Sequence, residues 1–464
     1  MDWFYNINLL EGWLPTTLKT LTLLGFIAVI VLKSKDGWFD SLLKQFGWGF
    51  IGTVVGYVVV WLLSDVFLVF GVSLGRVIEF NIAFGIGFIS VLVAMCFDSG
   101  TLRKVLAIIT AILTLATFAL RVDIIYGEYA TVGSLFGRNQ FSALEAKNVH
   151  KASATAANTV DEWKKLGKEG KLPADMPKKG IVRSVDIPAT TSNFKARTAN
   201  VYLPPAALTK NPPKLPVMVV MAGQPGTPDR FFSAGVLGDK LDSYAAKHYG
   251  LAPIAVSPDQ NGTITHNSLC SDTPVFGNAE TYLTRDVTTW IKKTLPVETS
   301  ADKWLIGGYS QGGTCATQLG AAHPNIYGHI YSAGGEIEPT DGSHKSTVKR
   351  FFNGDEKEFD KHVPINIIRS HAPSKQTWFS AAGQLDPKSQ KNQKAISTEA
   401  MKAGMSVTTV VVKGTAHDWH TVNAGMTAQI DLFGTETGLG ETGRQISSYP
   451  NLQVVAANTN RESD

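Results

Sequence analysis

The residues best suited to chemistry surround one serine in the last third of the chain. Gly308-Tyr309-Ser310-Gln311-Gly312 fits the pattern GxSxG and stands between the apolar run KWLIG and the helix-like run GGTCATQLGAAH. A serine at a sharp turn from a strand into a helix presents its hydroxyl for attack on an acyl carbon. Small neighbours are needed because such a turn leaves little room for side chains. The spacing therefore predicts Ser310 as a nucleophile.

An acid and then a histidine should follow a nucleophile of this kind along the chain. Asp386 lies just past the apolar run TWFSAAGQL, where the loop after a strand can carry a reactive group. Glu336 and Asp341, near the end of the preceding predicted strand, are the rival acids. We predict Asp386 as the acid, with the other two as alternatives.

The base is expected in the run VVVKGTAHDWH. It places His417 directly after the last predicted strand, with His420 three residues further on as the rival. In the expected mechanism His417 accepts the proton of Ser310. Asp386 then holds the imidazole in one tautomer and stabilises its charged form.

Acyl chemistry also needs backbone donors for the oxyanion that develops on the attacked carbonyl. One donor should be the N–H of Gln311, directly after the nucleophile. The other should come from the loop VVMAGQPGTP after the third predicted strand. Pro225 has no N–H, so we predict Gln224 as that donor, with Gly223 allowing a sharp turn.

The elements that must position these residues are short strands alternating with helical stretches. The candidate strands are GIVRSVDIPA, RTANVYLPP, PVMVVMAG, APIAVSP, KWLIGGYS, HIYSAGG, TWFSAAGQ and SVTTVVVKG. The central ones are nearly continuous apolar runs, as in parallel strands buried on both faces. The alternation predicts an α/β fold with a mostly parallel eight-stranded sheet and flanking helices.

Two of the three cysteines lie near the predicted nucleophile. Cys315 is five residues past Ser310, and Cys270 is in the loop after the fourth predicted strand, a neighbour of the fifth. A disulfide between them is permitted in an oxidising compartment, and two buried free thiols are the alternative. We predict a Cys270–Cys315 disulfide and an inert thiol at Cys96.

The first 125 residues have a different composition from the rest. The whole chain is 44% hydrophobic and only 18% charged, and the shortage of charge lies almost entirely in this part. A helix needs about 20 apolar residues to cross a bilayer, and four segments of this part reach or come close to that length. They run near Pro15–Leu32, Trp48–Phe70, Phe80–Phe97 and Lys104–Leu120. Since IGTVVGYVVVWLL lacks the polar face of a soluble helix, we predict a four-span transmembrane domain.

Basic residues predict the orientation of these spans. The first and third connections hold most of them, namely Lys33, Lys35, Lys44, Arg103 and Lys104, whereas the second holds only Arg76. Basic connections face the cytoplasm. Both termini, and the large domain that follows, are therefore expected outside the cytoplasm in a multi-pass cell-membrane protein.

Two features within the predicted spans suggest helix contacts. Gly52 and Gly56 form a GxxxG face suited to close packing, with chance as the alternative. Asp65 is an intramembrane acid that needs a partner, and Lys19 is expected at a similar depth. We favour a structural Lys19–Asp65 pair. The alternatives are a proton or substrate pathway, and a Lys19 side chain that extends to the membrane surface while Asp65 lies in a water-filled crevice.

The chain thus divides into three parts. These are a four-span transmembrane domain over residues 1–125, a polar connector over 126–179 and an α/β domain over 180–464. A net charge of +4 with no basic stripe argues against nucleic-acid binding. Neither HExxH nor paired CxxC is present, so we expect no metal or cofactor.

Several motifs together resemble a known group of enzymes. MAGQPG, AETYLTRDVTTWIKKTLPV, GGYSQGGTCA, SAAGQLD and GTAHDW, spread over residues 180–423, resemble the esterase D-type branch of α/β-hydrolases, which includes mycolyltransferases. Among these the chain looks most like an actinobacterial membrane-anchored member. The resemblance implies Ser310 as nucleophile, Asp386 or another acid in the acid role, and His417 as base. Secreted mycolyltransferases are soluble and carry Asp-Gly-Leu-Arg where this chain reads AGQPG, so mycolyl or trehalose specificity does not follow.

The leading hypothesis is a serine esterase or acyltransferase that acts through an acyl-enzyme on acyl esters of the cell envelope or membrane surface. Its expected partners are a lipid or glycolipid ester, the bilayer and envelope-lipid membrane proteins. The alternative is a non-catalytic envelope scaffold that keeps a hydrolase fold for binding beside a lipid-handling complex. A small four-helix transporter is the third hypothesis, supported only by one intramembrane acid.

Overall fold

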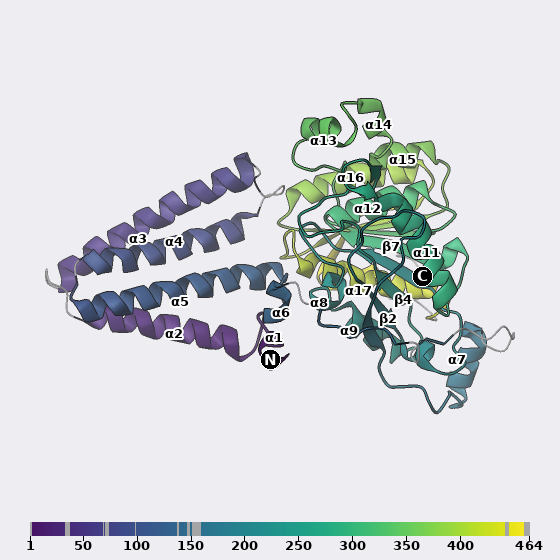
Figure 1. Cartoon of the computed structure of the whole chain (residues 1–464), viewed down its shortest axis with the longest axis horizontal. Helices are drawn as coiled ribbons and strands as arrows, with labels where there is room; N and C mark the ends of the chain where they lie inside the picture. The colour runs from purple at the N-terminus through teal and green to yellow at the C-terminus, as the bar shows by residue number, and fades with distance from the viewer. Residues whose placement is uncertain are drawn as a thin grey trace. The chain divides into compact units, whose positions relative to one another are not determined.

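The computed structural model describes residues 2–32, 38–67, 69, 74–97, 99–136, 139–145, 149–150, 159–440 and 445–458. Lys33 and Lys35, used above to predict the orientation, lie outside these ranges. The chain forms two compact units, Met1–Arg138 and Asn139–Asp464 (Figure 1).

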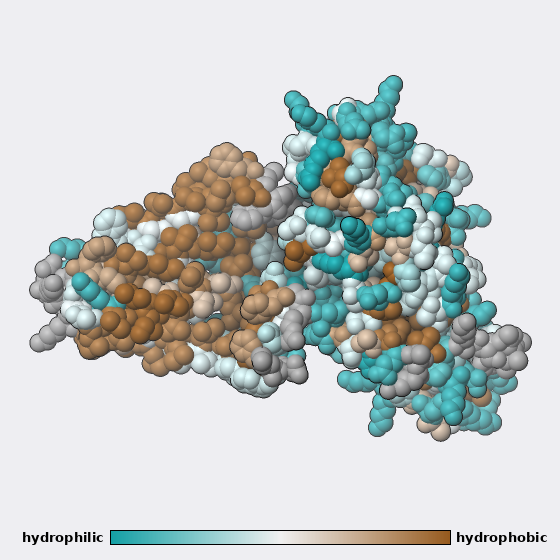
Figure 2. All heavy atoms as spheres, viewed as in Figure 1, coloured by the Kyte–Doolittle hydropathy of each residue, from teal (hydrophilic) through white to brown (hydrophobic). Residues whose placement is uncertain are grey.

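The first unit is helical. Its helices are α1 (Asp2–Tyr5), α2 (Trp13–Val31), α3 (Trp38–Trp61), α4 (Arg76–Phe97), α5 (Thr101–Tyr126) and α6 (Val132–Leu135), and α3 continues as a π-helical turn, η1 (Leu62–Val66). Four described helices are long and apolar enough to cross a membrane, which confirms the predicted number of such segments. The second of these begins ten residues before the predicted Trp48, so Lys44 lies within α3 and not in a loop. Apolar side chains dominate the visible surface of this unit (Figure 2).

Glycines bring α3 and α4 into close contact. A Cβ at Gly52 would lie 2.2 Å from Ser90 Oγ, and one at Gly56 would lie 3.0 Å from Ile86 Cδ1. On the facing helix, a Cβ at Gly87 would lie 2.0 Å from Thr53 Oγ1. The predicted GxxxG face is therefore a packing face, because any larger residue would push the two helices apart.

Asp65, which the sequence predicts as an intramembrane acid, has a different partner from the predicted one. Asp65 shares a hydrogen bond with the carboxyl group of Glu79, and Ser64 Oγ donates to Glu79 Oε1 at 3.0 Å. Lys19 is exposed on α2, which packs on α5. The structure therefore pairs Asp65 with α4 in place of Lys19, because α4 is the neighbour of α3.

The second unit is built on a large sheet. Its described strands are β1 (Ile181–Val185), β2 (Ala199–Leu203), β3 (Val217–Met221), β4 (Ile254–Ser257), β7 (Trp304–Tyr309), β8 (His329–Ala333), β9 (Thr377–Gly383), β10 (Ser406–Val412) and β11 (Leu452–Ala457). Their order is β1-β2-β4-β3-β7-β8-β9-β10-β11. The central strands β4, β3, β7, β8, β9 and β10 are parallel to one another. β1 and β2 are antiparallel to each other, β2 is antiparallel to β4, and β11 is antiparallel to β10. β5 (Asp272–Thr273) and β6 (Gly277–Asn278) form a separate two-stranded ladder.

Helices pack on both faces of this sheet, with α12 (Gln311–Ala322), α16 (Pro387–Lys402) and α17 (Trp419–Glu436) in direct contact with its strands. The other described helices of this unit are α7 (Val160–Lys168), α8 (Arg230–Ser233), α9 (Leu237–Ala245), α10 (Ala279–Thr281), α11 (Val287–Thr294), α13 (His344–Phe351), α14 (Glu356–Asp360) and α15 (Pro364–Ser370). Short turns are η3 (Pro205–Leu208), η4 (Tyr282–Asp286), η5 (Ala301–Lys303) and η6 (Ile446–Ser448).

Neighbouring residues of β8 show which helix covers which face. A Cβ at Gly320 of α12 would meet Ile330, whereas one at Gly425 of α17 would meet Tyr331. Successive strand residues point to opposite faces, so α12 and α17 lie on opposite sides of the sheet, as Figure 1 shows.

The architecture is the α/β-hydrolase fold, which confirms the predicted fold class. The eight predicted strands are all present, and the described residues add a ninth, β11, at the edge beside β10. Its sequence, LQVVAA, is short and near the end of the chain, and only pairing with β10 makes it a strand. In the central parallel strands β3, β4 and β7 every residue is buried, in keeping with helices on both faces.

Candidate active site

Ser310 sits at a strained turn between β7 and α12. Its backbone has φ 53° and ψ −120°, which is uncommon for a residue with a side chain. A Cβ at Gly308 would lie 2.1 Å from Gly312 O, and one at Gly312 would lie 2.1 Å from Met221 O. Both glycines of the GxSxG pattern are thus required, because backbone occupies the space that a side chain would need.

One imidazole connects the serine to a carboxylate. His417 Nε2 lies 2.9 Å from Ser310 Oγ, and His417 Nδ1 lies 2.8 Å from Asp386 Oδ2. The side chains of His417 and Asp386 are each 12% exposed. The structure therefore brings the three predicted residues into one hydrogen-bonded chain.

Helix caps fix the two loops that carry the histidine and the acid. Asp386 is the N-cap of α16 and accepts a hydrogen bond from the Ser389 N–H at 3.0 Å. Asp418, next to His417, is the N-cap of α17 and accepts from the N–H groups of Thr421 and Ala416. Capping satisfies N–H groups that a helix leaves unpaired. The loops that carry Asp386 and His417 are therefore held at fixed positions.

The environment of Asp386 favours its charged form. Burial by itself would raise the pKa of Asp386, but the hydrogen bond to His417, the charge of His417 and two hydrogen bonds from Ser389 outweigh it. The pKa is therefore held below its usual value of 3.8. A carboxylate at this position can stabilise a protonated imidazole.

The rival residues make other contacts. Glu336 accepts from Lys388 Nζ at 2.9 Å, and Asp341 pairs with Arg350 at 2.6 Å. His420 is exposed in the first turn of α17. Neither rival acid bonds to His417 in the part of the chain described by the structure, whereas Asp386 does.

The loop after β3 passes beside the serine. A Cβ at Gly223 would lie 3.2 Å from Ser310 Cβ, so the missing side chain lets the loop come close to the serine. The backbone φ of Gly223 is not positive, so the turn itself does not require glycine. Gln224 follows in that loop, before a cis peptide bond to Pro225. Gln311 is the first residue of α12, where a helix leaves N–H groups without internal partners. The two predicted oxyanion donors therefore belong to segments that meet at Ser310.

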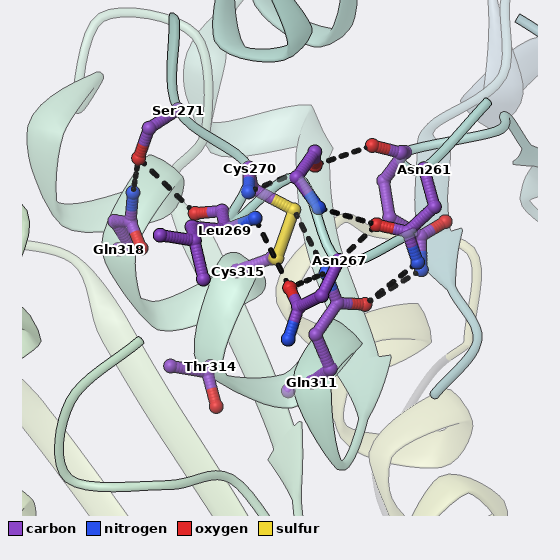
Figure 3. The surroundings of a disulfide bond; sticks show 12 residues. Asn261, Asn267, Leu269, Cys270, Ser271, Gln311, Thr314, Cys315 and Gln318 are labelled. Atoms are coloured by element: carbon purple, nitrogen blue, oxygen red, sulfur yellow. Dashed lines mark hydrogen bonds between the residues drawn. A yellow bond between two sulfur atoms is a disulfide. The ribbon is translucent and has the colours of Figure 1, made fainter. Parts of the chain in front are cut away.

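A disulfide joins the loop after β4 to the helix that starts at Ser310. Cys270 and Cys315 are bonded, with their Cα atoms 5.6 Å apart (Figure 3). Both residues are buried, and Cys315 lies in the second turn of α12. The loop after β4 is thereby fixed covalently next to the nucleophile.

A cluster of buried amides surrounds the Gln311 side chain, and sequence reasoning missed it. Gln311 Nε2 donates to Asn261 Oδ1 at 3.1 Å and to Asn267 Oδ1 at 3.2 Å, as Figure 3 shows. Gln260 Nε2 donates to Gln311 Oε1 at 3.1 Å and to the Ala222 carbonyl at 2.7 Å. The polar run SPDQNGTITHN directly after a strand was the available signal.

An ion pair ties the same loop to the loop after β3. Arg197 Nη2 lies 2.7 Å from Asp259 Oδ1, and Arg197 Nη1 donates to the Gly226 carbonyl at 2.9 Å. Asp259 is fully buried and also accepts from the N–H groups of Asn261 and Gly262. The two loops and the start of α12 are therefore linked into one rigid network.

Comparison with known proteins identifies the family. Residues 192–430, just over half of the chain, match the Esterase family model, described as “Putative esterase”. A protein of Corynebacterium glutamicum whose function is uncharacterized is 31% identical over 354 residues, covering 75% of this chain and 80% of its own length. The chain therefore belongs to the Esterase family of α/β-hydrolases.

Solved structures similar to this chain match it at low sequence identity. A ferulic acid esterase is 19% identical, with a TM-score of 0.47, and covers 56% of this chain and 98% of its own. An S-formylglutathione hydrolase from Agrobacterium tumefaciens is 16% identical, with a TM-score of 0.48, and covers 56% of this chain and 97% of its own. MPT51 of Mycobacterium tuberculosis is 16% identical, with a TM-score of 0.38, and covers 55% of this chain and 98% of its own.

Proposed function

We propose that this protein is a serine esterase or acyltransferase that acts on acyl esters of the cell envelope or membrane surface. The observation that carries the proposal is the hydrogen-bonded chain from Ser310 through His417 to Asp386. It lies at a strand-to-helix turn in which residues larger than Gly308 and Gly312 would clash with the backbone. This arrangement suits a nucleophile, a base and an orienting acid.

In the proposed reaction, Ser310 Oγ attacks the acyl carbon of the ester while His417 Nε2 accepts the hydroxyl proton. The tetrahedral intermediate collapses to an acyl-serine, and His417 gives the proton to the departing alcohol. Water, or the hydroxyl of a sugar or glycolipid, then attacks the acyl-serine and passes its proton to His417. The second tetrahedral intermediate collapses with cleavage of the bond to Ser310 Oγ, which takes the proton back from His417 as the acid or the new ester leaves. Asp386 stays charged throughout and holds the imidazole through Nδ1.

The proposed oxyanion donors are the N–H groups of Gln224 and Gln311. Gln260 supports this assignment because one side chain contacts both the Ala222 carbonyl, two residues before Gln224, and the Gln311 side chain. Donors fixed before the reaction need no reorganisation when charge develops on the carbonyl oxygen. The amide cluster is thus proposed to position both donors.

The decisive test is labelling by a fluorophosphonate, which reacts with an activated serine. The wild-type protein in membranes should be labelled and should hydrolyse a p-nitrophenyl ester, whereas Ser310→Ala should do neither. Ser332→Ala, which changes a buried serine on the neighbouring strand β8, is the matched control and should be labelled. Wild-type-like turnover by Ser310→Ala would reject the assignment. An unlabelled, inactive wild type would favour a binding scaffold.

The proposed location is the cell membrane, with the four long apolar helices of the first unit as its spans and both termini outside the cytoplasm. Lys44 and Lys104 lie at the predicted inner ends of their helices. Arg103, at the same end of α5, donates from Nε to the Val29 carbonyl near the end of α2. A disulfide in the second unit agrees with an oxidising compartment.

Protease treatment of intact spheroplasts tests the orientation. The second unit should be digested from outside, while a cytoplasmic marker protein should stay intact. Digestion only after the cells are broken would reverse the orientation and leave the proposed esterase activity untouched.

A further inference from the structure

One arginine from the segment between β1 and β2 reaches the loop that carries the proposed oxyanion donor Gln224. Arg197 Nη1 donates to the Gly226 carbonyl at 2.9 Å, and Arg197 Nη2 donates to Asp259 Oδ1 at 2.7 Å. A guanidinium is a planar fork, so its two ends can donate in different fixed directions at once. Arg197 therefore ties the loop after β3 to the loop after β4.

Asp259 holds this guanidinium in one place. Its carboxylate is fully buried, and besides the Arg197 side chain it accepts the backbone N–H of Arg197 at 2.7 Å. The N–H groups of Asn261 and Gly262 also donate to it, at 3.0 Å and 2.9 Å. A buried charge is tolerated when it is paired and hydrogen-bonded in this way. Because backbone N–H groups fix the carboxylate, the arginine is tied to a point that does not move.

The loop after β3 is thus held on both sides of Gln224. Gln260 Nε2 donates to the Ala222 carbonyl at 2.7 Å, two residues before Gln224. The bond from Arg197 reaches the carbonyl two residues after Gln224. Gln260 directly follows Asp259 in the chain. Two consecutive residues of the loop after β4 therefore control both carbonyls, one directly and the other through Arg197.

We propose that Arg197 is a positioning residue for the Gln224 N–H, and that it acts through the Gly226 carbonyl without touching the substrate. This inference rests on the proposed function, in which Gln224 donates to the oxyanion. Such a donor must lie at hydrogen-bond distance from the oxyanion of the transition state and not from the carbonyl of the bound ester. Loss of the bond to Gly226 should therefore weaken binding of the transition state and leave binding of the ester unchanged.

Arg197→Lys is the principal variant. It keeps a positive charge beside Asp259 but lacks the fork, so the Gly226 carbonyl should lose its donor. The full chain in nanodiscs should then hydrolyse a p-nitrophenyl ester with a kcat about tenfold lower and a KM within about twofold of the wild-type value. The loss should be smaller than the about 10²–10³-fold cost of deleting an oxyanion donor, because the Gln224 N–H remains.

A boronic acid measures the oxyanion contact directly. Butylboronic acid adds to the oxygen of an activated serine, and the tetrahedral adduct places one boron-bound oxygen where the oxyanion develops. Its inhibition constant should rise about tenfold in Arg197→Lys, by the same factor as kcat falls. Arg369→Lys changes an exposed ion pair with Glu399 and is the matched control. It should keep the wild-type kcat and inhibition constant.

Asp259→Asn leaves Arg197 without its charged partner and is the second variant, which should change both quantities in the same direction. Either variant that folds decides the outcome. Wild-type kcat and inhibition constant in the folded variants would overturn the proposal.

Two further outcomes would also overturn it. A lower kcat with an unchanged inhibition constant would show a purely structural ion pair, because unfolding lowers kcat without changing the affinity of the molecules that remain folded. A raised KM at normal kcat would place Arg197 in contact with the substrate. An inactive, unlabelled wild type would reject the proposed function, and this proposal with it.

Discussion

The two compact units have opposite arrangements of polarity. In the first unit, large side chains such as Phe50 and Ile112 are exposed at 72% and 64%, whereas Glu79 and Arg103 are buried at 1% and 3%. In the second unit, the parallel strands place apolar residues such as Val219 in a core with no exposure, and charged residues lie mostly outside. Figure 2 shows the same contrast on the visible surfaces.

This contrast fits water around the second unit and, as proposed above, lipid around the four long apolar helices of the first unit. Water drives apolar side chains of the second unit together, so its fold depends on buried area and on a covalent crosslink. Lipid exerts no such force between apolar helices, so in the proposed membrane location the first unit should depend on close backbone approach and on buried polar pairs. The two units should therefore respond to different kinds of substitution.

The largest effect is expected at the acid of the proposed active site. Asp386→Asn should lower kcat for a p-nitrophenyl ester by about 10⁴-fold, because the imidazole loses the carboxylate that fixes its tautomer. Glu336→Gln is the matched control and should keep nearly full activity. Steady-state kinetics on reconstituted protein provides the comparison. Equal activities in the two variants would show that Asp386 does not hold this role.

The next effect should be confined to the second unit. The disulfide closes a loop with a sequence separation of 45 residues. The chain-entropy model assigns such a bridge about 4 kcal/mol. Cys270→Ser combined with Cys315→Ser should lower the Tm of the second unit and reduce activity, but leave membrane insertion intact. Circular dichroism on heating measures the first effect.

A non-reduced digest provides the direct check of that bridge. The two cysteine peptides should appear linked in protein purified without reductant. Separate peptides, each alkylated as a free thiol, would contradict it.

A substitution that affects only the first unit should have a smaller effect. Gly52→Leu places a side chain against Ser90 and should destabilise the α3–α4 contact by ~1–3 kcal/mol. Gly47→Leu, on the same helix with nothing within 4 Å of a Cβ, should be tolerated. The temperature above which cysteines engineered into α3 and α4 can no longer be linked by an oxidant compares them, and ester hydrolysis should remain unchanged in both. Identical stability of the two variants would remove the packing role of Gly52.

The smallest effect concerns an exposed ion cluster of the second unit. Hydrogen bonds to Glu356 and then Glu338 raise the pKa of His344 above its usual 6.5, against a smaller opposite effect of burial. The protonated form is therefore favoured by folding. Its contribution should be fully present below pH 6.5 and should be lost as the pH rises through the folded-state pKa.

Because the His344 side chain is 44% exposed, solvent screening should limit that contribution to a few tenths of a kcal/mol, or about 0.5 at most. The Tm difference between wild type and His344→Gln should be larger at pH 5.5 than at pH 8. A difference that grows with pH would reverse this assignment.

Several features could be predicted from the sequence because they depend on neighbouring residues. The turn at Ser310 follows from glycines two residues away on each side, which the backbone there requires. The central strands follow from runs of apolar residues, and the four long apolar helices from their composition. The order of serine, acid and histidine along the chain led to Asp386 and His417 as candidates.

Other features were decided only by the tertiary structure. β11 is a strand because β10 offers it an edge, and Asp65 pairs with Glu79 because α4, not α2, is the neighbour of α3. The amide cluster joins Gln311 to Asn261, a partner 50 residues distant in sequence. Hydrogen bonds and ion pairs depend on distances of about 3 Å, and residues far apart in sequence reach such distances only after the chain has folded. Composition and periodicity can therefore predict an element and its buried face, while the partner of a polar side chain follows from the packing of whole elements.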